Sequence, residues 1–448
     1  MKLLFLRNRK IAAALMMFSL FGLLYSCQEL EDLIHHPQKP SSQEKADVVY
    51  DWYELIVEIQ LNSSPYPQLH TNLKNLGYIG VGLYEAVYPG TKGAVSLSSK
   101  LYQMPAMPEP EKHREYLWGA SANAALASMC KQFLGLSDAD MARIDSMEDA
   151  YNEKFRAKTS EAVFTRSQAF GRAIATSIYD WSTTDNFTVS NEGYIIPEFP
   201  GAWVPTPPAF ANPIGPFIAD SRPFLEYSLT ATAPPLPFPY SEDPTSEFYK
   251  AAKEVYDIGA TLTDEQKAIA DLWGGVGGPG VAFAGGGHLL SITTDVLKSK
   301  KAKLGQAAEV YAKTGIGLKD GPIVTWRGKF GFNLIRPITY INQHIDPAYL
   351  SYLTNPPYPE YPSGLAGLYS PVFQVLIREF GDIPVTDNAY DWRGVVPRHY
   401  ASITEMNIES ASSRVYGGLH YQFTMDISRE IGKQLGDQIA NIDLTPKY

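Results

Sequence analysis

The chain has 448 residues, of which 45% are hydrophobic and 12% aromatic, and it carries a formal net charge of -10 at pH 7. This acidic balance argues against a nucleic-acid-binding protein, because such proteins present a basic surface to the phosphate backbone. The length suggests about three domains. Neither a long low-complexity linker nor a repeat of about 20 to 50 residues divides the sequence.

The first residues have the pattern of an export signal. Four basic residues precede an apolar run at 11–25, which is short for a membrane-spanning helix. The run leads into LYSC, ending at Cys27, and this tetrapeptide resembles the cleavage box of bacterial lipoproteins. The resemblance implies cleavage before Cys27 and attachment of lipid to it. An ordinary signal peptide with an incidental cysteine is the alternative. Loss of the four basic residues would take the net charge from -10 to -14.

The acidic sequence QELED after Cys27 is similar to the surface-export signals of some Gram-negative lipoproteins. We therefore expect an outer-membrane lipoprotein that faces either the periplasm or the cell surface. The second cysteine, Cys130, lies in the apolar helical stretch ANAALASMCKQFL. With lipid on Cys27 it has no disulfide partner, so a buried, inert thiol is expected.

Helical spacing of apolar residues dominates the chain, and the best of a few strand-like alternations is 94–103. Ser41 with Glu44, and Thr263 with Gln266, have the spacing of capping boxes. The expected helices lie at 46–61, 72–88, 115–134, 138–181 (interrupted or bent), 264–275, 289–299, 301–314, 321–335, 364–380 and 403–437. The sequence therefore predicts an all-α protein built from packed helical bundles.

Two segments depart from the helical pattern. Residues 192–249 are dense in proline and aromatic side chains, and so long a stretch without regular structure predicts either a covering lid or a rigid wrap between two bundles. Residues 274–288 are rich in glycine but lack the Lys-Ser/Thr ending of a phosphate-binding loop and do not follow a strand. They predict a flexible loop, with His288 incidental at its end.

Three segments in the last third of the chain carry anion-binding groups. In the first, Lys329 and Arg336 are seven residues apart, which on a continuous helix would place both on one face, about 10 Å apart along the axis. Two cations among apolar neighbours favour an anionic partner, and Pro337 favours a break at Arg336. Taken alone, the pair also fits two side chains that reach from a helix to solvent.

The second segment is the start of the expected helix at 364–380. Ser363 and Gly364 would lie at its N-terminus, where free N–H groups suit an oxyanion; Ser363 as a simple N-cap is the alternative. In the third segment, Arg414 and His420 flank two consecutive glycines. A continuous helix would turn them to different faces, whereas a break at the glycines would let them converge.

Together the three segments, 329–337, 362–364 and 413–420, resemble the tripartite signature of the superfamily of vanadium-dependent haloperoxidases and type 2 phosphatidic acid phosphatases. The surrounding sequences WRGKFGFNLIRPITYI, PPYPEYPSG and SSRVYGGLHYQF are similar to its bacterial haloperoxidase branch. The resemblance extends from about residue 47 onward. It implies an all-α fold of two packed helical bundles, of the haloperoxidase and acid phosphatase type, with one oxyanion pocket.

On this basis the sequence divides into four parts. They are a lipoprotein signal peptide at 1–26, a tether at 27–46, an N-terminal helical bundle with the proline-rich loop at 47–250, and a C-terminal helical bundle with the oxyanion site at 251–448.

The resemblance also implies a role for each matching residue. His420 would bind vanadium, when vanadate is present, or attack phosphorus as a nucleophile. The oxygens of vanadate or phosphate would be neutralised or hydrogen-bonded by five residues: Lys329, Arg336, Arg414, Ser363 and the N–H of Gly364.

Two positions depart from the family pattern. Where the family usually has an acid–base histidine after Pro-Ser-Gly, this chain has Leu365, and losing a general acid lowers a rate by about 10²–10⁴-fold. Where the family often has an aspartate four residues after the apical histidine, this chain has Thr424. Its hydroxyl could accept a hydrogen bond from His420 but supplies no charge. The candidate replacement donors, each with a structural or solvated role as the alternative, are Glu360, His344 and His399.

Both departures weaken proton transfer and leave the anion-binding residues in place. The sequence therefore predicts an exported lipoprotein that binds phosphate or vanadate and acts as a phosphoesterase of reduced acid–base power or as a vanadium-dependent peroxidase. A non-catalytic lipoprotein that binds oxyanions, or surface glycans, is the alternative. The expected partners are a small oxyanion or phosphoester and the membrane, through lipid on Cys27, with no nucleic acid. No oligomeric state is assigned.

Overall fold

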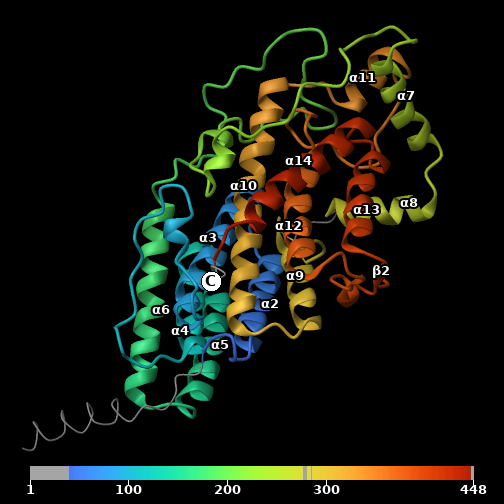
Figure 1. The fold of residues 1–448 in the computed structure, drawn as a ribbon. Helices are drawn as coiled ribbons and strands as arrows, with labels where there is room; N and C mark the ends of the chain where they lie inside the picture. Colours follow the sequence, from blue (N-terminus) through green and yellow to red (C-terminus); the bar gives the residue numbers. More distant parts are fainter. Residues whose placement is uncertain (1–39, 276–279, 284, 445–448) are drawn as a thin grey trace, which may run out of the picture.

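The computed structural model describes residues 40–275, 280–283 and 285–444. In this part of the chain it contains thirteen α-helices, labelled α2 to α14, and one two-stranded sheet (Figure 1), which confirms the all-α prediction. The expected signal run and Cys27 lie outside the described residues, as does part of the glycine-rich segment. No helix within the described residues is long and apolar enough to cross a membrane.

The helices fall into an earlier and a later group along the chain. The earlier helices are α2 (Asp47–Asn62), α3 (Leu69–Val87), α4 (Trp118–Phe133), α5 (Asp138–Arg156) and α6 (Glu161–Ser182). The later helices are α7 (Glu247–Ala260), α8 (Asp264–Gly274), α9 (Gly287–Ser299), α10 (Leu304–Phe332), α11 (Pro337–His344), α12 (Gly364–Phe380), α13 (Ile403–Tyr416) and α14 (Gln422–Ala440).

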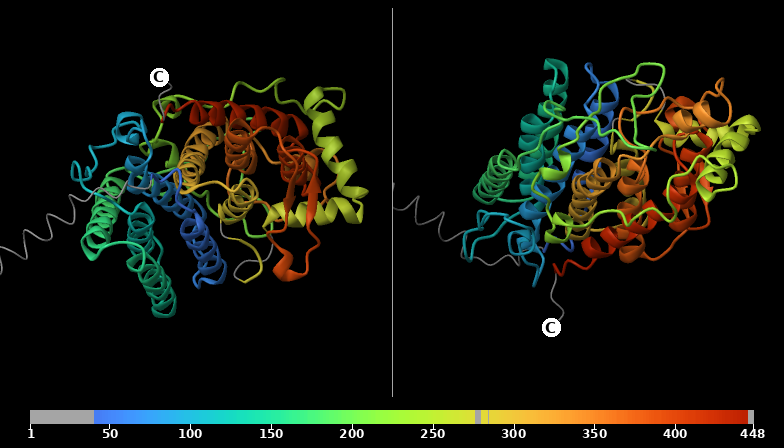
Figure 2. Two further views of the ribbon diagram at one scale, coloured as in Figure 1. Left: turned by 60° about the horizontal axis from the view of Figure 1, so that its bottom comes forward. Right: turned by 90° about the horizontal axis from the view of Figure 1, so that it is seen from above.

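The long helix α10 lies at the centre of the molecule. It packs against α3 on one side and α12 on the other, and α14 packs against α12 (Figure 1). On the far side of α3, α4 and α6 pack against each other and against α3 (Figure 2). Glycines allow the close contact of α10 with α3, because a Cβ at Gly315 would lie 2.9 Å from the carbonyl oxygen of Gly77.

α10 was predicted as two helices, at 301–314 and 321–335, and this was wrong. It is one helix of 29 residues with Pro322 inside it. A proline in a helix interior costs about 3 kcal/mol. Nearly every residue of α10 between Ala307 and Lys329 is buried, so packing on several sides offsets this cost.

The helix starts were predicted with mixed success. Thr263 and Gln266 form the expected capping box at α8. The expected box of Ser41 and Glu44 is wrong: Ala46 precedes α2 without a side-chain cap. The Glu44 carboxylate instead accepts hydrogen bonds from the first two N–H groups of α4, at 3.0 and 2.9 Å. That helix end has no side-chain cap of its own, so a tertiary contact satisfies its free donors.

The strand prediction at 94–103 was also wrong. This segment contains a short 3-10 turn, Leu97–Ser99. The Glu85 carboxylate accepts bonds there from the Ser96 hydroxyl and the Leu97 N–H. The sheet lies later in the chain, where β1 (Val385–Asp387) pairs antiparallel with β2 (Arg398–Tyr400). Cys130 is fully buried, as expected, and burial raises the pKa of its thiol.

The proline-rich segment runs over the end of α10. It is joined to the chain after α10 by hydrogen bonds from the Trp203 N–H to Asn333 O (2.6 Å) and from the Ile335 N–H to Gly201 O (2.8 Å). Farther along, Pro234 O accepts a bond from the Tyr361 hydroxyl at 2.7 Å. These bonds favour the rigid wrap over the lid, and they fix the segment against the residues that carry the candidate site.

Candidate functional site

Lys329 and Arg336 are both fully buried, but they do not share one helix face as predicted. α10 ends at Phe332, and Asn333 after it has a φ of +48°, a left-handed conformation that ends helices. Arg336 precedes α11, which starts at Pro337, a residue favoured at the first position of a helix. The break, rather than helical periodicity, brings the two cations together.

Backbone carbonyl groups hold both cations against the loop before α12. The Lys329 ammonium donates to Pro359 O (2.9 Å) and Glu360 O (3.0 Å). The Arg336 guanidinium donates to Tyr358 O at 2.9 Å and to Leu419 O at 3.0 Å. The Tyr358 ring lies 4.9 Å from the Lys329 ammonium and 5.2 Å from the Arg336 guanidinium carbon. Cation–π contact adds to these bonds.

The third cation, Arg414, lies in the last turn of α13. Its Nε and Nη1 atoms are buried and have no hydrogen-bond partner among the described residues. Burial lowers the pKa of this guanidinium. Burial also lowers the pKa of Lys329 well below its ordinary value, and the Arg336 charge adds to the effect. The buried Lys329 and Arg336 and the partly buried Arg414 therefore lie near one another with a shortage of negative charge.

Glu360 is the carboxylate of this cluster, and it positions His420. Its Oε1 lies 2.8 Å from His420 Nδ1, and it also accepts bonds from the Tyr421 N–H (3.1 Å) and the Thr424 hydroxyl (2.9 Å). Thr424 was expected to accept a bond from His420; instead it donates to Glu360. Burial raises the pKa of Glu360 to about 7, although the positive charges of Arg336 and Lys329 act to lower it.

An ionised Glu360 sets the tautomer of His420. With Nδ1–H donating to the carboxylate, the lone pair lies on Nε2, where it accepts a hydrogen bond from Arg336 Nη1 at 3.4 Å. Burial lowers the pKa of His420 well below its ordinary value, and the three cations lower it further. The ring is therefore neutral at neutral pH, which suits a nucleophile or a ligand.

Ser363 caps α12, as one of the two sequence interpretations held. Its hydroxyl accepts a bond from the Ala366 N–H at 3.5 Å, while its own N–H donates to Ser428 at 2.8 Å. Gly364 lies close to α10: a Cβ there would lie 3.2 Å from the Trp326 ring and 3.6 Å from the Lys329 side chain. The start of α12 is thereby held directly beside Lys329.

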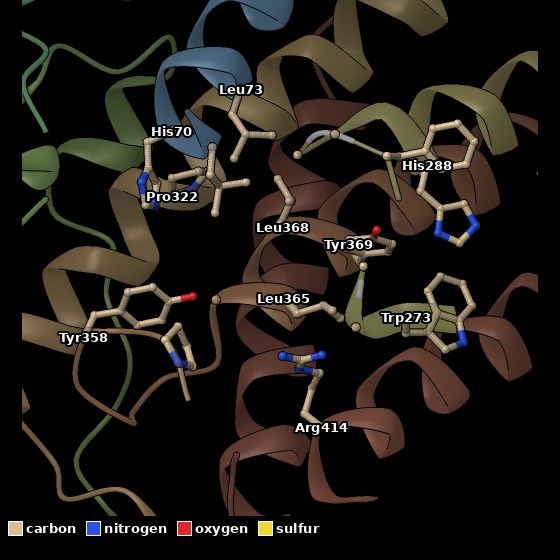
Figure 3. A pocket seen from close by; sticks show the side chains of 18 of the residues that line it. His70, Leu73, Trp273, His288, Pro322, Tyr358, Leu365, Leu368, Tyr369 and Arg414 are labelled. Atoms are coloured by element: carbon tan, nitrogen blue, oxygen red, sulfur yellow. The ribbon is translucent and has the colours of Figure 1, made fainter. Parts of the chain in front are cut away.

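A cavity of about 220 Å³ opens in front of these groups (Figure 3). Gly364, Leu365, Arg414 and His420 all line it, so the break after α13 brings the last two together as the glycines suggested. Lys329 and Arg336 are not among the residues that line it. Leu365 forms part of an apolar lining to which several tyrosine and tryptophan side chains contribute. It offers no proton.

The other candidate donors have different surroundings. His344 lies near Tyr240 and Glu242, and His399 contacts Thr386 on the sheet; neither lines the cavity. His288, which was expected to be incidental, lines the cavity. It is buried there beside Asp387, with its Nε2 2.8 Å from Oδ2.

Sequence reasoning missed a further histidine, His70, which is buried and lines the same cavity. It also considered Glu360 only as a replacement acid. The position of Glu360 just before Pro-Ser-Gly was the available signal. The described residues contain no group of three or more His, Cys, Asp or Glu side chains that could hold a metal ion.

Comparisons with known proteins agree with this geometry. A family model described as the second helical-bundle domain of VCPO matches residues 309–444. Vanadium chloroperoxidase from Curvularia inaequalis is 24% identical in sequence over 28% of this chain and 29% of its own length. The chain thus matches less than a third of that curated relative.

Two solved structures resemble the whole described fold. A crystal structure titled as the first bacterial vanadium-dependent iodoperoxidase matches with a TM-score of 0.78 and 28% sequence identity, over 89% of this chain and 96% of its own. The holo form of a bacterial vanadium-dependent chloroperoxidase shares the fold, with a TM-score of 0.62 and 17% identity over 83% and 91% of the two chains. With the three motif segments packed together in the structure, these matches support the vanadium haloperoxidase superfamily as the family that this chain resembles.

Proposed function

We propose that this protein binds a tetrahedral oxyanion beside His420 and hydrolyses phosphoesters there. The observation that carries the proposal is the charge of the site: Lys329, Arg336 and Arg414 are brought together with Glu360 as the carboxylate that offsets them. Buried charges need partners, and two nitrogens of Arg414 lack one among the described residues. A phosphate group would supply the missing negative charge.

His420 would act as the nucleophile. Its Nε2 lone pair attacks phosphorus, the bond from phosphorus to the leaving oxygen breaks, and the three cations stabilise the charge on the remaining oxygens. Glu360 holds the imidazole through Nδ1 and stabilises the positive charge that develops on it. Leu365 cannot protonate the leaving oxygen. The favoured substrates are therefore esters of acidic alcohols, such as aryl phosphates, whose anions leave without a proton.

Vanadate fits the same residues, because it has the tetrahedral shape and charge of phosphate. Lys329, Arg336, Arg414 and the N-terminus of α12 would hold its oxygens, and His420 Nε2 would be its protein ligand. Bound there, vanadate would supply Lewis-acid activation of hydrogen peroxide for halide oxidation. A vanadium-dependent peroxidase is accordingly the second candidate function, favoured by the 28% identity to the iodoperoxidase.

We further propose that the protein is exported, because residues 1–27 have the pattern of a lipoprotein signal. The chain would be attached to the outer membrane by lipid on Cys27, with the cavity facing the periplasm or the cell surface. Replacing Cys27→Ser would remove the lipid, so the protein would leave the membrane fraction. Membrane association that persists in this variant would contradict the anchor.

Calorimetric titration of orthovanadate and phosphate, on protein lacking residues 1–27, tests the anion site. An aryl phosphate assay and a peroxide–iodide assay run beside it, and His420→Ala is compared with His399→Ala, whose ring lies away from the cavity. We expect anion binding, and turnover that only His420→Ala abolishes. Binding without turnover would indicate a non-catalytic oxyanion-binding lipoprotein. Absence of binding would overturn the site and favour a glycan-binding function instead.

A further inference from the structure

His70, near the start of α3, is an unusual histidine for an apolar interior. It is 2% exposed, and neither ring nitrogen has a hydrogen-bond partner among the described residues. Its ring meets the Trp326 ring edge-on, with 4.3 Å between centroids. It lines the same cavity as His420 and Arg414, on the side formed by Pro322 and Tyr358 (Figure 3).

The lack of a hydrogen-bond partner for His70 destabilises the folded protein, whereas a side chain with only a structural role would not have this cost. A buried polar group without a partner costs about 1–3 kcal/mol, and an apolar residue would pack as well between α3 and α10. The His70 side chain lines a cavity of about 220 Å³, and both of its ring nitrogens are buried there. A ligand or water in that cavity is the partner that the imidazole lacks.

His70 lies near Lys329, whose charge influences its imidazole. Trp326, which contacts His70, precedes Lys329 by one helical turn of α10, which corresponds to about 4.5 Å along the axis. Burial lowers the pKa of His70 to about 3, and the charge of Lys329 also acts to lower it. His70 is therefore neutral at neutral pH and holds a free lone pair.

Resting on the phosphoesterase function, we propose that His70 is the general base for hydrolysis of the phosphorylated His420. In this step a water oxygen forms a bond to phosphorus, and the bond from phosphorus to His420 Nε2 breaks with its electron pair returning to the ring. One water proton passes to an unpartnered nitrogen of His70 and then to solvent as phosphate leaves. His70 thus serves the second half of the reaction, while the first half proceeds without a proton donor at Leu365.

The other titratable groups of the cavity suit this step less well. His288 is paired with Asp387. Burial raises the pKa of the Tyr358 hydroxyl, so it keeps its proton. A neutral imidazole is a base rather than an acid, which agrees with a first step that releases an acidic alcohol without assistance.

Burst kinetics with 4-nitrophenyl phosphate, on full-length protein in detergent, separate the two half-reactions. In His70→Gln we expect the initial burst of one nitrophenolate per site to remain, while steady-state turnover falls about 10²-fold or more. Phosphorylated protein should then accumulate, visible by intact mass, and added imidazole should restore part of the turnover. His399→Gln is the matched histidine control and should behave as the unmodified protein.

Three results would overturn the inference. One is unchanged steady-state turnover in His70→Gln. Another is a parallel loss of burst and turnover in both His70→Gln and His70→Asn while each variant still binds vanadate, because that places His70 in the first step. If the unmodified protein itself shows neither burst nor turnover, the phosphoesterase function fails, and the role of His70 fails with it.

Discussion

At the scale of single residues, the groups that would bind an anion destabilise the anion-free protein. Arg414 keeps two buried nitrogens without partners in a cluster that already holds Lys329 and Arg336. An unpaired buried charge destabilises a fold, and removing it can stabilise the fold even though a hydrogen-bonding group is lost. The anion-free site should therefore be a weak point of the folded protein, and the bound anion should correct it.

Arg414→Met directly tests this relation between the stability of the anion-free protein and its affinity for an anion. The substitution removes the unpaired charge, so we expect a higher Tm in buffer free of phosphate and vanadate. It also removes charged hydrogen bonds to the anion, each worth about 1.5–3 kcal/mol, so the Kd for phosphate should rise about 10–150-fold. Thermal unfolding with and without phosphate measures both effects.

Arg378→Met is the matched control, because Arg378 pairs with Asp437 at the surface. Such pairs contribute little, so neither the Tm nor the response to phosphate should change much. A lower Tm for Arg414→Met in anion-free buffer would contradict the view of Arg414 as an unsatisfied charge.

Glu360→Gln tests the control of the His420 tautomer. The carbonyl oxygen of glutamine can still accept the Nδ1–H bond, but it carries no negative charge to fix this tautomer or to stabilise the positive charge that develops on the imidazole. The rate of phosphorylation of His420 by an aryl phosphate should fall about 10–100-fold, as for other partners that orient a reacting histidine. Rapid-mixing measurement of the nitrophenolate burst gives this rate.

Thr424→Val is the companion variant, since it removes one hydrogen bond to Glu360 and leaves the carboxylate in place. Its burst rate should fall by less than that of Glu360→Gln. Equal rates in Glu360→Gln and the unmodified protein would show that the carboxylate does not set the tautomer.

The candidate site could be predicted in part from the sequence. Lys329, Arg336, Arg414 and His420 carry charge or lone pairs in motifs of fixed spacing, so their convergence was foreseeable. His70 was not, because it lies more than 250 positions before Lys329 and only the packing of α3 on α10 brings it to the cavity. A lone histidine on an apolar helix gives no signal of its own.

At the scale of elements, the site depends on how closely α10 meets the loop before α12. Gly328 lies one residue before Lys329, and a Cβ there would come within 2.6 Å of the Pro362 ring and 3.3 Å of the Ala233 side chain. Both neighbours are held in place, Pro362 by the start of α12 and Ala233 by the proline-rich segment. A larger residue at Gly328 must therefore push the loop away from Lys329.

We expect Gly328→Ala to destabilise the protein by about 1–3 kcal/mol through overpacking and to weaken phosphate binding. Gly331→Ala, in the same helix, is the control: no atom lies within 4 Å of its Cβ position, and alanine favours a helix by about 0.5–1 kcal/mol over glycine. Urea unfolding should therefore move in opposite directions for the two variants. Equal shifts would mean that helix propensity, not the contact with Pro362, decides the effect.

The helices were largely predictable, because burial on one face repeats with the helical period. The incorrect helix predictions have the same cause: tertiary packing overrides the local sequence signal. Packing on several sides keeps Pro322 inside one helix, and Glu44 satisfies the start of α4 rather than its own helix. The two strands are three residues each, too short for an alternating pattern to be recognised.

At the scale of the whole molecule, buried acids link stability to pH. Glu85 is fully buried, and its carboxylate holds the turn at Leu97–Ser99 through two hydrogen bonds. Burial nevertheless raises the pKa of Glu85 to about 7, although these two hydrogen bonds act to lower it. Between the ordinary pKa of a glutamate, about 4.3, and about 7, the folded state binds more protons than the unfolded state. The contribution of Glu85 to stability is therefore complete below this window and is lost as the pH rises through it.

Glu85→Gln isolates this contribution from that of His70, whose lowered pKa acts with the opposite sign below about pH 6.5. Glutamine never ionises, so the variant should be more stable relative to the unmodified protein at pH 8 than at pH 5. In unfolding free energy this change should approach about 3 kcal/mol, and the Tm of both proteins at the two pH values reports it. The exposed Glu198→Gln should show no such difference. A Glu85→Gln Tm difference that stays the same at pH 5 and pH 8 would mean that the buried carboxyl is ionised throughout, stabilised by the Ser96 and Leu97 bonds more than it is destabilised by burial.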